Sequence, residues 1–112
     1  MKLIDNNYTH LLAKAMDVYS LRQRVTASNI ANIDTPGYNK HEVQFEKQLR
    51  KAQQAQGDMK DVNPSIVETN KDVVLEDEML GMADTQMRVR LVAQSLRQHF
   101  DLLQTGITGT NR

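Results

Sequence analysis

Apolar residues recur at helical spacing at both ends of this chain, and a proline-glycine pair follows directly after the first run. From Ile4 to about Ala31 the sequence contains no glycine or proline, and apolar residues lie seven positions apart. At 1.5 Å per residue, this run predicts a helical arm of roughly 40 Å. The seam positions that we expect to carry its packing are Leu11, Val18 and Val25.

The C-terminal run shows the clearer helical pattern. From Leu75 onward its apolar positions alternate in steps of three and four residues, with Gln86 as the polar exception. Three acidic residues at 76–78 would lie in the first turn, where they complement the helix dipole. The run predicts a second helix of roughly 45–50 Å. Its expected seam residues are Met82, Val89, Leu96, Phe100 and Leu103.

Three positions near the end of the first seam are polar, namely Arg22, Asn29 and Asn32. A simple pair of helices tolerates such groups poorly unless something meets them. Asn29 and Asn32 lie three residues apart on one helical face, so their amides need hydrogen-bond partners. We expect a joint between molecules to supply those partners.

The first helix must end by Thr35, because the residue before a proline is pushed out of the helical region. The next two residues, proline and glycine, occupy the second and third positions of a four-residue turn, a pattern typical of type II. This segment predicts a shaped joint between two helical arms, without a catalytic group. The candidate joint residues are Asn29, Asn32, Asp34, Thr35, Pro36, Gly37 and Tyr38.

The pattern predicts an all-α fold whose long terminal helices pack as a coiled-coil-like pair within one structural unit. A short helix is expected from Glu42 to Gln54, and an irregular connector follows, with Ile66-Val67 as a minor strand candidate. The expected segments are an N-terminal assembly helix at 1–34, a turn and short helical segment at 35–50, a flexible polar connector at 51–72 and a C-terminal assembly helix at 73–112.

The charges balance in total but not along the chain. The sequence holds 14 basic and 14 acidic residues. Residues 1–56 carry 8 Lys and Arg against 5 Asp and Glu, whereas residues 57–112 carry 6 against 9. This asymmetry favours pairing between the two halves, within one molecule or between neighbours. It does not favour nucleic acid, which requires a clustered basic face.

The sequence lacks the residues that several kinds of site require. There is no cysteine, which excludes a disulfide framework, a thiolate zinc site and a cysteine nucleophile. The histidines, His10, His41 and His99, occupy isolated positions, and no His-Glu-x-x-His or glycine-rich phosphate loop occurs. The sequence therefore predicts no catalytic, cofactor-binding or metal-binding residues.

The first residues contain no apolar core of signal-peptide length, and no stretch approaches a membrane span. We therefore expect a cytoplasmic protein, or one that leaves the cell by a route that needs no cleaved signal.

The segment Ser28–Tyr38 closely resembles the N-terminal signature of the flagellar rod, hook and hook-associated protein family. Its Asp-Thr-Pro-Gly-Tyr ending is similar to that of proximal rod subunits in particular. Leu21–Arg24, Phe45 with Leu49, and Val74–Met79 fit the same subtype. The resemblance covers both ends of the chain, while the middle is shorter than the subtype suggests.

The resemblance implies a non-enzymatic building block of the bacterial flagellar basal body, in the periplasmic rod. It implies export by the flagellar type III apparatus without a cleaved signal peptide, and terminal helices that pack as an inner layer. The implied partners are copies of the chain, other rod proteins, the rod-base adaptor protein, the MS ring and the export gate. Nucleic acid binding and direct membrane insertion are not implied, and neither is a cofactor.

Two other classes compete with this hypothesis. A cytoplasmic helical-hairpin adaptor or export chaperone would share the seams and the neutral charge, and it predicts a stable soluble dimer. A small metal-dependent hydrolase would use His41 and Glu42, and it predicts metal binding.

Overall fold

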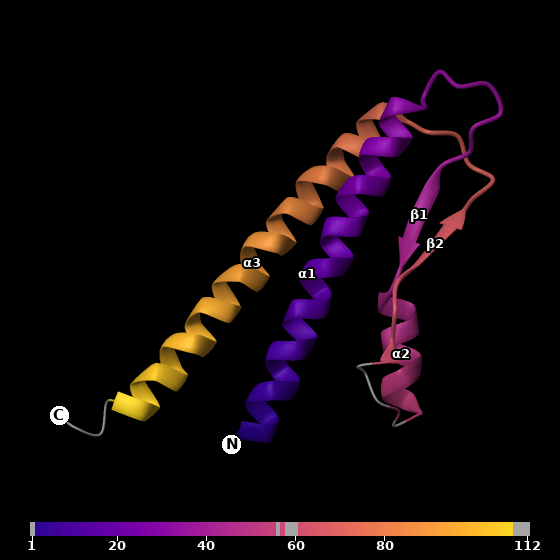
Figure 1. Cartoon of the computed structure of the whole chain (residues 1–112). Helices are drawn as coiled ribbons and strands as arrows, with labels where there is room; N and C mark the ends of the chain where they lie inside the picture. The colour runs from indigo at the N-terminus through magenta and orange to yellow at the C-terminus, as the bar shows by residue number, and fades with distance from the viewer. Residues whose placement is uncertain (1, 56, 58–60, 109–112) are drawn as a thin grey trace.

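The computed structural model describes residues 2–55, 57 and 61–108, and it places three helices and two strands there in three columns. Figure 1 shows α1 in the middle, α3 along one side of it, and a unit of strand, helix and strand along the other. The elements are α1 (Lys2–Ala31), β1 (His41–Gln44), α2 (Glu46–Gln54), β2 (Ser65–Glu68) and α3 (Leu75–Thr108).

The molecule is a thin slab. Its principal extents are 64 × 31 × 14 Å, and its radius of gyration is 17.9 Å. A compact domain of this length would have a radius of gyration of about 13 Å. The smallest extent is close to the width of one helix, so no helix has neighbours above and below it. Both broad faces of α1 and α3 are therefore open to other molecules.

The two long terminal helices confirm the main expectation from the apolar spacing. α1 and α3 run antiparallel and contact each other, and in Figure 1 they lie closest near the end of α1 and the start of α3 and diverge toward the chain termini. α3 extends to Thr108. Among the described helices, none combines the length and the apolarity that crossing a bilayer requires.

The expectation of an all-α fold was wrong in the middle of the chain. β1 and β2 form an antiparallel two-stranded sheet in which Val43 pairs with Ile66. The ladder continues beyond the strands, because the Lys40 N–H donates to the Lys71 carbonyl at 2.9 Å. The expected irregular connector thus contains β2, and the minor strand candidate Ile66-Val67 lies inside it.

The short helix begins later than predicted, at Glu46 rather than Glu42. Residues 41–44 are extended because their backbone groups pair with β2 while the Val43 side chain is buried. If these residues were helical, they would lose their backbone hydrogen bonds with β2. The sequence pattern missed this because the strand partner lies more than twenty residues away.

The hydrophobic core lies between α1 and the strand-helix-strand unit, not along the seam of the two long helices. Its buried members are Val18, Val43, Phe45 and Val62. Partly buried Leu21, Val25, Leu49 and Ala52 pack around them. Each fully buried apolar side chain contributes about 1.5–3 kcal/mol. The strand-helix-strand unit therefore stabilises α1, because α3 covers only one side of that helix.

Candidate assembly joint

The side chain of Asn29 connects the three columns of the slab. Only 1% of Asn29 is exposed. Its Oδ1 accepts from the Tyr38 hydroxyl and from the His41 N–H, both at 3.0 Å. Its Nδ2 donates to the His41 carbonyl at 2.9 Å and to Glu78 Oε2 at 3.3 Å. The amide thus uses both acceptor and both donor positions.

This arrangement corrects the sequence-based argument about Asn29. The expectation that its amide needs a partner from another molecule was wrong, because all four hydrogen bonds are made within the chain. The amide pairs with both backbone groups of His41, as a neighbouring strand would do. Asn29 therefore fixes the start of β1 and the first turn of α3 against the end of α1.

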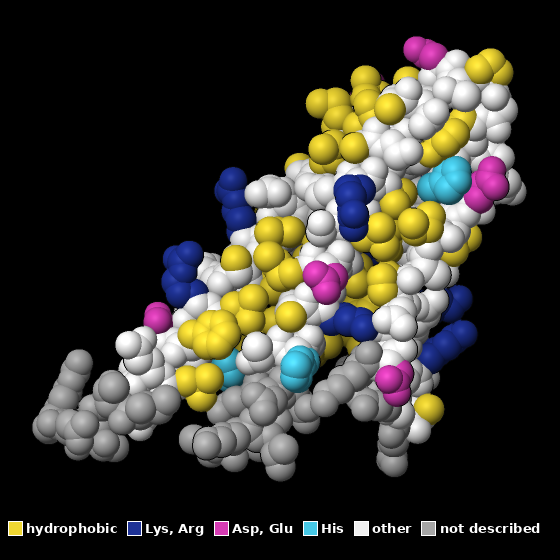
Figure 2. Space-filling model, viewed as in Figure 1, with side chains coloured by type: hydrophobic (Ala, Val, Ile, Leu, Met, Phe, Trp, Pro, Cys, Tyr) yellow, Lys and Arg dark blue, Asp and Glu magenta, His cyan; other side chains and the backbone are white. Residues whose placement is uncertain are grey.

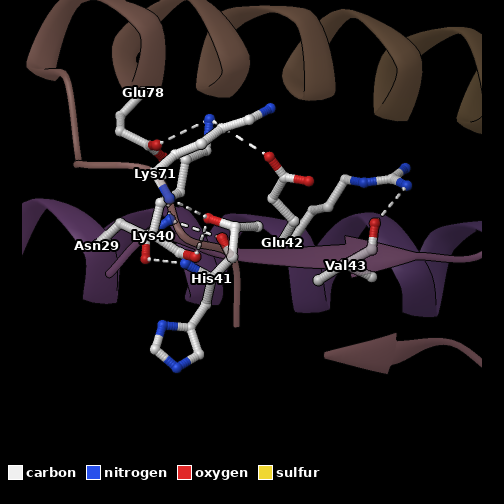
Figure 3. Close-up of polar contacts among 9 residues, drawn as sticks. Asn29, Lys40, His41, Glu42, Val43, Lys71 and Glu78 are labelled. Atoms are coloured by element: carbon white, nitrogen blue, oxygen red, sulfur yellow. Dashed lines mark hydrogen bonds and ion pairs between the residues drawn. The ribbon is translucent and has the colours of Figure 1, made fainter. Parts of the chain in front are cut away.

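Glu78 is the buried anion of the joint, with 3% of it exposed. Its Oε1 lies 3.3 Å from Lys40 Nζ, while its Oε2 accepts from Asn29. Figure 3 shows Lys40 Nζ between the carboxylates of Glu78 and Glu42. The Glu42 Oε1 atom lies 3.9 Å from Lys40 Nζ. A buried carboxylate needs such partners, because an uncompensated buried charge is strongly destabilising.

Arg22 holds the strand-helix-strand unit to α1 further along the slab. Its guanidinium donates to both carboxylate oxygens of Glu46 at 2.6 and 2.5 Å, and to the Val43 carbonyl at 3.1 Å. This explains why a polar residue occupies the apolar seam of α1. The bidentate geometry fixes orientation as well as charge.

The contact between Arg22 and Glu46 makes the stability of the fold depend on pH. Hydrogen bonding from Arg22 lowers the pKa of Glu46. A lowered pKa means that this pair stabilises the fold above the unfolded-state pKa of about 4.3 and stops doing so as the pH falls through the lower folded value. We expect the difference in unfolding free energy between wild type and Glu46→Gln to shrink towards zero from about pH 5 to about pH 3. Urea unfolding at each pH measures it, and a constant difference would contradict the assignment.

The turn that follows α1 agrees with the predicted geometry at two points. The Tyr38 N–H donates to the Thr35 carbonyl at 3.2 Å, and Gly37 has a φ of +77°. Both are features of a type II turn. The Asn32 side chain bonds only to nearby residues of the described chain. Its Nδ2 donates to the Ser28 carbonyl at 2.8 Å, and its Oδ1 accepts from the Thr35 hydroxyl at 3.1 Å.

A side chain at Gly37 should strain the turn. A Cβ there would meet nothing within 4 Å, so the cost comes from the backbone and not from a clash. We expect Gly37→Val to lower the unfolding free energy by about 1–2 kcal/mol and to impair assembly. Gly37→Asn is the matched control, because asparagine visits positive φ more readily. Equal urea midpoints for the two variants would show that this φ is not required.

Two of the three expected seam residues of α1 face the strand-helix-strand unit and not α3. Val18 is fully buried and belongs to the core shared with the strand-helix-strand unit. Val25 packs against the same core, and Leu11 is half-buried. On α3, Met82, Val89, Leu96 and Leu103 are half-buried. The Gln23 amide donates to the Met82 carbonyl at 3.3 Å, which ties the two long helices together.

Phe100 does not lie in the seam as predicted, because 54% of it is exposed. The seam of α3 also includes Glu78 and Thr85, which are buried, and His99, which is half-buried and meets Tyr8 at a tilted angle with ring centroids 4.9 Å apart. The inward positions Glu78, Thr85 and His99 each fall one residue before a predicted one, whereas Met82, Val89, Leu96 and Leu103 lie where the pattern predicted.

The opposite face of α3 carries an apolar stripe that no residue described by the structure covers. Its members share one side of the helix because they are spaced by seven, four and eleven residues. All are well exposed, up to 71% for Leu102. Figure 2 shows hydrophobic side chains along α3 on the face in view as well. The outer stripe consists of Leu80, Met87, Leu91 and Leu102.

The histidines do not form a metal site in the part of the chain that the structure describes. No three His, Cys, Asp or Glu side chains lie together there as a metal site requires. His41 contributes its backbone to the joint, and its ring points away from the Glu78 cluster and lies beside Tyr38, with ring centroids 5.1 Å apart (Figure 3).

Comparison with known proteins places the joint in a recognisable segment. Residues 12–39 match the family of flagella basal body rod proteins. The chain is 54% identical over 37 residues to the flagellar basal body rod protein FlgB of Borreliella burgdorferi, and 44% identical over 41 residues to FlgB of Escherichia coli. These alignments cover 33% and 37% of this chain, and only 27% and 30% of those relatives.

A third relative extends the similarity to most of the chain. FlgB of Bacillus subtilis is 26% identical over 117 residues, which covers 88% of this chain and 91% of that protein. The chain is thus similar to the rod proteins of the bacterial flagellum. The three relatives named above are FlgB proteins, and the resemblance seen in the sequence signature is confirmed.

Proposed function

We propose that this chain is a structural subunit of the proximal rod of the bacterial flagellar basal body, and not an enzyme. The similarity to FlgB proteins supports the class of protein. The signature segment that carries it, residues 12–39, contains the Asn29 joint and the turn. In this proposal the chemistry of the segment is architectural, because its polar groups hold helices and strands at fixed positions.

The observation that carries the proposal is the outer stripe of α3. Leu80 and Leu102 lie 22 residues apart, so the stripe extends over roughly 33 Å of helix. A stripe of this length that faces away from α1 is typical of a surface that other molecules cover. Neighbouring subunits would bury it, and contacts that join different patches on successive copies build an open helical tube.

The joint would give every copy the same shape. Because Asn29 and Arg22 fix the strand-helix-strand unit and α3 onto α1, identical subunits present identical surfaces to one another. The exposed turn residues Asp34, Thr35 and Pro36 would contact neighbours, whereas Asn29 acts inside the subunit. The half-buried seam would complete its burial on assembly, which couples stability to polymerisation.

The remaining parts of the proposal concern the cell. The subunit would leave the cytoplasm through the flagellar type III apparatus and take its place in the periplasmic rod. Its partners would be copies of itself, other rod proteins, the rod-base adaptor protein, the MS ring and the export gate.

Deletion of the gene in the source organism tests the function. We expect loss of rod and hook in electron micrographs of basal bodies, with the membrane ring still present, and restoration by the wild-type gene. Intact basal bodies with normal motility would refute the proposal. A cytoplasmic hairpin adaptor or export chaperone would then be the better interpretation, and purified protein would form a stable soluble dimer.

A further inference from the structure

The solvent face of α2 carries a basic stripe that pairs with no acidic residue among those the structure describes. Lys47, Arg50 and Lys51 are exposed and lie at helical spacing on the side away from the buried Phe45 and half-buried Leu49. None of the three forms an ion pair with a described residue. In Figure 2 basic side chains stand at the outer edge of the slab on the side of α2.

A groove of opposite character lies over α1, between α3 and β1. Its cavity volume is about 290 Å³. Its charged lining consists of Arg22, Lys40, Glu42, Asp77, Glu78 and Asp84, which makes four acidic groups against two basic ones. We call it the acidic groove.

Both cations of the acidic groove are already engaged. Arg22 is bound to Glu46, and Lys40 is closest to the buried Glu78. Lys40 is shared between Glu78 and Glu42, whose Oε1 lies 3.9 Å from Lys40 Nζ, and Asp84 shares its charge with Arg88 at 3.0 Å. One cation thus faces two carboxylates and Asp77 has no ion-pair partner among the described residues, so the net charge of the groove is acidic. The groove would attract a cationic element and repel an acidic one.

The basic stripe and the acidic groove match in size as well as in sign. The nine residues of α2 form a helix of roughly 13 Å. The groove follows α3 from Asp77 to Thr85, which is roughly 12 Å. The stripe points away from α1, at the edge of the slab, so it does not reach the groove of its own molecule. A second copy is the partner that presents the complementary surface.

We infer that the basic stripe of one copy docks in the acidic groove of the next copy. This inference rests on the proposed function, and it adds a specific contact between subunits that is separate from the outer stripe of α3. The contact joins different patches on the two copies, so it repeats without closing. It also explains the opposite charge of the two halves of the chain, because the stripe lies in the basic half and most of the groove's acids lie in the acidic half.

Charge reversal with rescue tests the contact in the deletion strain. The stripe variant is Lys47→Glu, Arg50→Glu and Lys51→Glu, and the groove variant is Glu42→Lys, Asp77→Lys and Asp84→Lys. We expect each variant to assemble fewer than about a tenth of the wild-type number of rods, and the combined variant to restore most of them. Normal rods from the stripe variant would overturn the inference and leave the proposed function intact, whereas failure of the wild-type gene to restore rods would count against the proposed function.

Cross-linking of the purified protein gives a test that does not depend on rods or on the stability of the charge variants. The chain has no cysteine, so only engineered thiols react. We expect Lys51→Cys and Asp77→Cys chains, when mixed, to form a disulfide-linked dimer whose yield falls at least about fivefold between about 20 mM and about 500 mM salt. The control pairs Glu68→Cys, exposed on β2, with Asp77→Cys. A yield no higher than this control would overturn the inference.

Discussion

Replacing Asn29 with alanine should lower the free energy of unfolding by about 3 kcal/mol, the largest loss expected from one polar residue of this chain. The variant removes four hydrogen bonds at once. It leaves both backbone groups of His41 without their partner, and it takes a donor from the buried carboxylate of Glu78. An unsatisfied buried polar group costs more than the hydrogen bond contributed, so the effect exceeds that of an exposed amide.

Asn32→Ala is the matched control for this prediction. Asn32 lies on the same helical face, but it is half-buried and its two hydrogen bonds stay within its own turn. We expect a loss of only about 0.5–1 kcal/mol from that variant. Thermal unfolding followed by circular dichroism should show Asn29→Ala melting at least about 10 °C below wild type. Similar melting temperatures for the two variants would mean that the Asn29 network does not hold the three columns together.

The sequence predicted the long elements of the fold and missed the short ones for a physical reason. Helical spacing is a local signal, so the runs that became α1 and α3 were evident without a partner. β1 and β2 are four residues each, and they pair across more than twenty residues. Only Val43 and Ile66-Val67 carry strand-forming character there, which is too little to identify a two-stranded sheet from sequence.

The candidate joint was located by sequence, but its chemistry was not. The polar positions Arg22 and Asn29 in an apolar seam correctly indicated that something must meet them. Their partners, Glu46 and Glu78, were not identified, since Glu78 has an ordinary place in the acidic first turn of α3. A signal was present: Glu78 lies seven residues before Thr85, so two polar residues share a helical face with the seam.

The pair Leu91→Asp and Leu96→Asp should separate assembly from folding, because the two residues lie five positions apart on opposite faces of α3. Leu91 belongs to the outer stripe and is 58% exposed, so its charge stays in water in the isolated chain. We expect its unfolding free energy to change by less than about 0.5 kcal/mol. In the rod the same carboxylate would be buried against a neighbour, and burying an unpaired charge is prohibitive, so we expect no motility.

Leu96→Asp should lose motility by a different route. Leu96 is half-buried on the face of α3 that also carries Glu78, which contacts α1. A carboxylate there enters the helix pair itself, so we expect the isolated chain to lose about 2–4 kcal/mol of stability. Swimming assays in the deletion strain and thermal unfolding of the purified variants measure the two effects. Wild-type swimming with Leu91→Asp would show that the outer stripe is not covered in the rod, because a covered stripe would bury the new carboxylate and prevent assembly.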